Sequence, residues 1–236
     1  MYYLLSSLIW FLTGNPLLAL AILAAVYLYA DRRYIGLLPD FTRPFRRRRH
    51  MARLAATIRA NPADANAQLE LGAFHLESGA AARALPLLEK ARERNPDSAR
   101  LHFLLGAAYR RLGRNAEARQ ALEKAVILNP KVAYGEPYYH LLAIGLRDQP
   151  PDEGALTEFR ARIFSHGSPE VFYRAGRALL SAGKHAEARE MFQEAVENYR
   201  ASPKGFRRAH RRWAAASKLF ILWSARSEEH TSELQS

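Results

Sequence analysis

An Asn-Pro dipeptide returns every 34 residues in this chain, as Asn61-Pro62, Asn95-Pro96 and Asn129-Pro130. Small and apolar residues between the prolines return at the same interval. Five identical pairs share this spacing: Gly72 and Gly106, Gly79 and Gly113, Ala84 and Ala118, Leu88 and Leu122, and Ala91 and Ala125. Matches at so many places without a gap are very rare by chance, and a fixed period of this size predicts a solenoid of stacked repeats.

Each repeat has the pattern of two short amphipathic helices. In the first repeat the apolar residues fall at helical spacing in two groups, and Gly79 stands between them as the expected turn, since glycine tolerates a positive φ. Pro96 is expected to end the second helix, because proline lacks an N–H and clashes with the preceding turn. The small residues Gly72 and Ala84 would let the two helices approach closely. Neither helix can bury its apolar side alone, so the pairs must stack.

The repeat resembles the tetratricopeptide repeat, a helix–turn–helix unit of 34 residues. Leu71-Gly72 and Leu105-Gly106 match its Leu-Gly signature, in frames that cover residues 65–98 and 99–132. The resemblance implies an all-α fold, a right-handed α-solenoid of the bacterial type. It covers about two-thirds of the chain, and its spacing is highly specific.

Further units extend this frame over residues 51–203. Residues 169–202 form another repeat, with Gly176 and Gly183 in register. Residues 136–168 fit loosely, as a degenerate repeat after a three-residue insertion at 133–135. Residues 51–64 have the pattern of a leading half unit that caps the stack.

The net charge of +12 belongs to the flanks of the repeats. Residues 31–60 carry nine Arg against two Asp, and residues 204–226 carry seven basic residues and no acidic one. Residues 61–203 hold 19 basic and 18 acidic residues, which leaves the solenoid nearly neutral. The chain has no cysteine, which excludes disulfides and thiolate metal sites.

The amino-terminal 30 residues carry no charge. A bilayer core requires about 20 apolar helical residues, and a helix that starts near Ile9 would reach this length. We therefore expect residues 1–30 to form a transmembrane or membrane-inserted anchor, kinked at 13–16, followed by a basic juxtamembrane linker at 31–50. The arginines after the apolar block predict a cytoplasmic repeat domain at the cell membrane. A cleaved signal peptide is disfavoured, since no basic residue precedes the apolar block.

We expect residues 1–49 to contact membrane lipid. Two arginine clusters are candidates for contact with the membrane surface. The clusters are Arg46, Arg47, Arg48 and Arg49, and Arg207, Arg208, Arg211 and Arg212. The second lies in a predicted basic amphipathic capping helix at 204–225. The apolar stripe expected on that helix comprises Phe206, Ala209, Trp213, Ala216, Phe220 and Trp223. Capping, membrane contact and nucleic-acid binding are all compatible with this pattern. Residues 226–236 resemble translated sequencing adapter and are interpreted as a non-native tail.

The sequence contains none of the catalytic motifs sought. It has no phosphate-binding glycine loop, no His-Glu-x-x-His and no Gly-x-Ser-x-Gly. The eight histidines are dispersed, and no pair stands at a metal-ligand spacing. We therefore expect a protein that is not an enzyme and uses neither a cofactor nor a metal.

Partner peptides of tetratricopeptide repeats usually bind the concave face, which the first helix of each unit lines. The resemblance therefore implies a protein-binding groove formed by Leu69, Phe103, Arg110, His140, Arg147, Tyr173 and Arg177. The predicted function is that of a membrane-anchored scaffold or assembly factor, which binds a segment of another protein. The alternative is a nucleic-acid binder that uses the basic flanks, although no known nucleic-acid module accompanies them.

Overall fold

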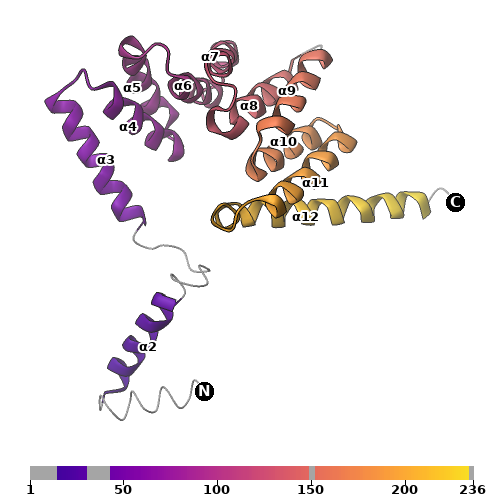
Figure 1. Ribbon diagram of the computed structural model, residues 1–236, viewed down its shortest axis with the longest axis horizontal. Helices are drawn as coiled ribbons and strands as arrows, with labels where there is room; N and C mark the ends of the chain where they lie inside the picture. The colour runs from indigo at the N-terminus through magenta and orange to yellow at the C-terminus, as the bar shows by residue number, and fades with distance from the viewer. Residues whose placement is uncertain (1–14, 31–42, 149–151, 234–236) are drawn as a thin grey trace. The chain divides into compact units, whose positions relative to one another are not determined.

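The computed structural model describes residues 15–30, 43–148 and 152–233, and every regular element in these ranges is a helix. The chain divides into two compact units, Met1–Ala52 and Arg53–Ser236. Within the second unit, successive helices pack side by side from α4 to α11 (Figure 1). The all-helical prediction is therefore confirmed for the described part of the chain.

The first unit contains helix α2, Pro16–Ala30. Asn15 caps its start, with the side-chain Oδ1 accepting from the backbone N of Leu17 at 2.9 Å. The helix has 15 residues and is therefore about 22 Å long, against about 30 Å for a bilayer core. The described residues contain no helix that is long and apolar enough to cross a membrane.

This finding overturns the predicted transmembrane anchor and the cell-membrane localisation. The physical reason is that the helix begins at Pro16 and offers too few apolar residues. Residues 1–14, which hold the start of the predicted anchor and half of its kink at 13–16, lie outside the described residues. Helix α3 begins at Arg43 and ends at Ala60, so the arginine run belongs to a helix and not to a linker.

The repeats are helix pairs that fall within the predicted frames. Their bounds are α4 (Ala65–Glu77) with α5 (Ala81–Arg94), α6 (Ala99–Arg111) with α7 (Asn115–Leu128), α8 (Glu136–Gly145) with α9 (Glu153–His166), and α10 (Pro169–Ser181) with α11 (His185–Ala201). Three of the four turns between paired helices contain a glycine with φ between 76° and 82°, as expected at Gly79, Gly113 and Gly183.

The paired helices approach each other at a glycine of the first helix. A Cβ built on Gly106 would lie 2.5 Å from Cγ of Leu122, and one on Gly72 would lie 2.9 Å from Cγ of Leu88. Gly176 and Gly145 meet Phe192 and Leu156 in the same way in the later pairs. The close approach therefore extends to the degenerate repeat, where the sequence match is weakest.

Two of the three Asn-Pro dipeptides are tied to the following helix by a buried polar side chain. Gln68 Nε2 donates to the carbonyl of Pro62 at 2.6 Å, and His102 Nε2 lies 2.7 Å from the carbonyl of Pro96. Gln68 and His102 are 34 residues apart and are both buried. His102 is therefore buried as a hydrogen-bonding partner of the backbone, in the same place as Gln68 of the preceding repeat.

The three-residue insertion forms a left-handed turn. The 3₁₀ helix η2, Val132–Gly135, contains Ala133 at φ 50°, Tyr134 at φ 52° and Gly135 at φ 77°. This turn separates α7 from α8.

The last helix, α12 (Lys204–Glu233), packs against α11 and α10. Its most deeply buried residues are Ala214 and Ser217, so the buried side is rotated from the predicted stripe, in which Ala209 is exposed. Phe220 stacks on Phe192 with ring centroids 4.9 Å apart. The helix runs past residue 225 into the predicted non-native tail.

Candidate functional site

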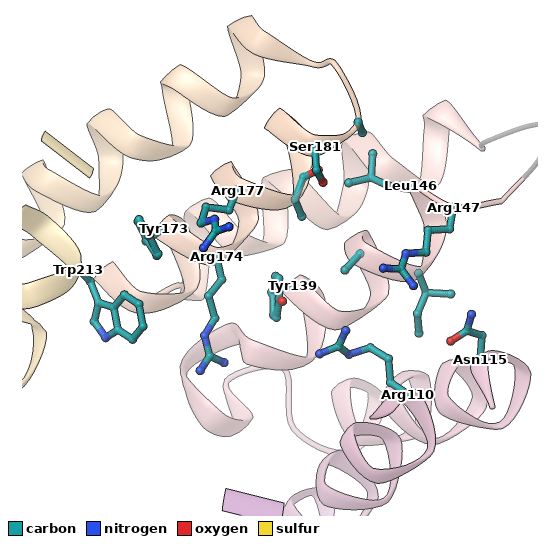
Figure 2. A pocket seen from close by; sticks show the side chains of 14 residues that line it. Arg110, Asn115, Tyr139, Leu146, Arg147, Tyr173, Arg174, Arg177, Ser181 and Trp213 are labelled. Carbon is teal, nitrogen blue, oxygen red and sulfur yellow. The ribbon is translucent and has the colours of Figure 1, made fainter. Parts of the chain in front are cut away.

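A pocket of about 710 Å³ lies between the first helices of the later repeats (Figure 2). Helix α6 contributes Arg110, α8 contributes Tyr139, and the turn after α8 contributes Arg147. Helix α10 contributes five of the lining residues. The lining residues of α10 are Tyr173, Arg174, Arg177, Ala178 and Ser181. Trp213 of α12 completes the lining, so the capping helix belongs to the site.

Four of the seven predicted groove residues line this pocket, namely Arg110, Arg147, Tyr173 and Arg177. Their role in binding stays a prediction. The other three, Leu69, Phe103 and His140, are buried in the core and offer a partner no accessible side chain. The prediction misplaced them because groove-facing and core-facing residues are neighbours in the sequence of a helix. A small error in the assumed rotation of the helix therefore exchanges one for the other.

Sequence reasoning missed the other lining residues, among them Tyr139, Arg174 and Trp213. Tyr139 is half-buried and lines the pocket, whereas the adjacent His140 is buried in the core, as are Leu69 and Phe103 at the same place in their repeats. Trp213 was assigned to the capping stripe, and its periodicity on that helix was the available signal. No sequence signal pointed to Arg174.

Arg174 is held by two carboxylates. Its Nη1 donates to Oε1 of Glu136 at 2.6 Å, and its Nη2 lies 2.7 Å from Oε1 of Glu170. The charge of this arginine is therefore compensated inside the protein. The Arg174 guanidinium lies 5.9 Å from the Tyr139 ring, and Figure 2 shows Arg110 and Arg147 on the other side of that ring.

An aromatic cluster forms the end of the pocket at α12. The rings of Tyr173 and Trp213 have centroids 5.1 Å apart, and Tyr173 also lies 5.9 Å from Phe192 and 6.1 Å from Phe220. The Arg212 guanidinium lies 4.5 Å from the Trp213 ring. These contacts fix the α12 wall relative to α10 and give the pocket a partly apolar surface.

His140 lies behind the pocket, enclosed by positive charge. Burial lowers its pKa well below the ordinary value, and Arg110, Arg174 and Arg111 lower it further. The Nε2 atom is 3.7 Å from Oε1 of Glu136, whose own pKa is raised by burial against the opposing effect of Arg174. At a pH at which an exposed histidine is protonated, the His140 ring therefore stays neutral in the folded chain.

We expect the thermal stability to fall as the pH is lowered from about 7.5 to about 5.5. The unfolded chain takes up a proton on His140 near the ordinary pKa of 6.5, whereas the folded chain does not, so acid favours unfolding. Glu136 opposes this trend, because its raised pKa makes the folded chain the better proton acceptor above 4.5. The melting temperature of His140→Phe should depend less on pH, while the exposed His185→Phe variant should follow the parent.

The remaining predicted surface arginines lie outside the pocket lining. Arg46, Arg48 and Arg49 are exposed on α3, and Arg47 is half-buried. On α12, Arg208 and Arg211 are exposed, while Arg207 donates through Nε to the carbonyl of Ser202 at 2.8 Å. Contact of these arginines with a membrane surface stays a prediction. Within the described ranges, no group of three His, Cys, Asp or Glu residues is placed to hold a metal ion.

Three family models described as tetratricopeptide repeat match the chain, over residues 52–91, 75–143 and 170–202. The matched segments include three of the four helix pairs and most of α8. The chain is a tetratricopeptide-repeat protein. The sequence resemblance is thereby confirmed. No curated protein matches the chain.

Solved structures are similar to this chain. "Crystal structure of MamA" has a TM-score of 0.51 at 23% identity, and the alignment covers 69% of this chain and 96% of that one. "Crystal structure of MamA protein" has a TM-score of 0.49 at 24% identity and covers 64% and 81%. MamA from Desulfovibrio magneticus RS-1 has a TM-score of 0.39 at 20% identity and covers 70% and 72%. At this identity the first likeness shows the fold alone.

Proposed function

We propose that this tetratricopeptide-repeat protein is a non-catalytic scaffold that binds a segment of another protein. The observation that carries the proposal is the pocket of about 710 Å³ between α6, α8, α10 and α12. Its lining combines exposed arginines with the rings of Tyr139, Tyr173 and Trp213. Aromatic and arginine side chains contribute most of the binding energy in many protein interfaces.

The construction of the site also supports a peptide ligand. Its walls come from helices that pack on one another through fully buried residues, such as Leu142, Phe172 and Leu179. A wall held in this way loses little conformational entropy when a partner binds. An extended or helical segment can then contribute side chains to the pocket while its remaining residues lie on the adjoining helices.

The proposal is tested by filling the pocket from within. Ser181 is exposed at the pocket, and its Oγ donates to the carbonyl of Ala178 at 2.7 Å. Ser181→Trp should weaken the binding of peptides selected from a random display library by about tenfold or more, because the indole would occupy space that a partner needs. Binding is measured by fluorescence anisotropy with the purified chain.

Ser165 on α9 provides a matched control. It is also exposed, donates to the carbonyl of Ala161 at 3.1 Å and lies outside the pocket lining. Ser165→Trp should leave peptide affinity unchanged. Equal effects of the two tryptophans, or a library that yields no binding peptide, would count against the proposed function.

A further inference from the structure

The pocket is lined by charge of a single sign. Four arginines and no aspartate or glutamate contribute to its lining. The solenoid around it is nearly neutral, with 19 basic and 18 acidic residues over 61–203. The positive charge is therefore concentrated at the pocket and is not a general property of the repeats.

Three of these arginines have no acidic partner. Within the described residues, no carboxylate lies within 4.0 Å of Arg110, Arg147 or Arg177. Arg174 differs, since Glu136 and Glu170 already compensate its charge. Arg147 and Arg177 are exposed, so their guanidinium groups are available to a ligand.

The three unpaired arginines come from different elements. Arg110 belongs to α6, Arg147 to the turn after α8, and Arg177 to α10. Figure 2 shows Arg177 on one side of Tyr139 and the other two on the opposite side. The Arg110 guanidinium lies 5.8 Å from the Tyr139 ring. A ligand beside that ring would therefore meet cationic donors from two sides.

We propose that the partner segment is acidic and that its side-chain carboxylates pair with Arg147 and Arg177, with Arg110 contributing a third positive charge. This inference rests on the proposed function. A planar guanidinium binds a carboxylate through two parallel N–H···O bonds, and such charge-assisted bonds are stronger than neutral ones. Apolar residues of the segment contact Tyr139 and Ile144, which also line the pocket.

An acidic protein segment fits the charge distribution better than a nucleic acid does. A nucleic acid carries one charge per nucleotide along its length, and proteins that bind it present an extended basic track. Arg110, Arg147 and Arg177 line one pocket, together with uncharged residues such as Leu146 and Ala178. A few carboxylates on a short segment match this arrangement.

The test measures the binding of a Glu-rich peptide and of its counterpart with Gln in place of Glu. Both peptides are acetylated and amidated, so that side-chain carboxylates are the only anionic groups. The Glu peptide should bind the full chain at least about tenfold more tightly, and the difference should shrink at high salt. Arg147→Gln and Arg177→Gln should each weaken Glu-peptide binding by about tenfold.

Two controls accompany these variants. Arg100→Gln removes the same charge from an exposed position on α6 outside the pocket lining, and it should leave affinity unchanged. Arg177→Lys keeps the charge but loses the planar fork, so its affinity should fall between those of the parent and Arg177→Gln. Thermal unfolding of each variant verifies that the solenoid is intact.

The outcomes separate the two proposals. Equal binding of the Glu and Gln peptides, with both lost in Ser181→Trp, would overturn the acidic partner and leave the scaffold function standing. Failure of every peptide, including those selected from the library, would overturn both. Tighter binding of a single-stranded oligonucleotide that displaces the Glu peptide would overturn the acidic protein segment in favour of nucleic acid.

Discussion

Leu122→Ala should lower the free energy of unfolding by about 2–5 kcal/mol, the usual cost of emptying a packed site in a core. Leu122 is fully buried on α7, and its Cγ lies against the backbone of α6 at Gly106. The rigid backbone at the glycine cannot move into the space that the leucine leaves, so a cavity should remain. Urea denaturation followed by circular dichroism measures the loss.

Ile127→Ala is the matched control on the same helix. Ile127 is 80% exposed, so its truncation should change the free energy of unfolding by about 0.5 kcal/mol or less. A Leu122→Ala variant as stable as Ile127→Ala would mean that α6 and α7 do not pack in the register described.

The repeat frame was predictable because its causes are local. A glycine at three of the four turns, a glycine at each helix contact and a proline after the second helix act within a single unit. Even the degenerate pair keeps the close contact between Gly145 and Leu156. The insertion at 133–135 was also visible in the sequence, and the structure places the η2 turn there.

The composition of the pocket was only partly predictable, because it depends on contacts between units. The partners of Arg174 include Glu136, which is 38 residues earlier in the chain, and no pattern within one repeat indicates that pair. His140 and Tyr139 are adjacent, and only the packing of α8 against its neighbouring helices shows which of them is buried. The buried Phe103 illustrates the same limit, since the frame alone does not fix the rotation of a helix.

The short apolar helix was misread for a related reason. The sequence shows that residues 1–30 are apolar and uncharged, but it does not show where a helix starts. The described helix starts at Pro16, a residue favoured at the first helical position, and Asn15 caps it. The apolar character of the segment was predicted correctly. The length of the helix depends on its start, which Asn15 and Pro16 determine.

Gly106→Leu should destabilise the chain by about 3 kcal/mol, toward the upper end of the usual cost of overpacking. A Cβ at this position would lie 2.5 Å from Leu122 Cγ and 3.2 Å from the carbonyl oxygen of Ala118. The α7 backbone must therefore move away, which also disturbs the contact of α7 with α8. Gly205→Leu is the control, because Gly205 has no atom within 4 Å of a built Cβ.

The double variant Gly106→Leu with Leu122→Ala tests whether the two residues share one space. The leucine at position 106 can enter the volume that Leu122 vacates, so the combined loss should be smaller than the sum of the single losses by about 1 kcal/mol or more. The carbonyl of Ala118 still restricts the new side chain, so the parent stability should not be fully restored. Strict additivity of the two changes would show that Gly106 and Leu122 are not in contact, and the helix pairing that positions the pocket would have to be redrawn.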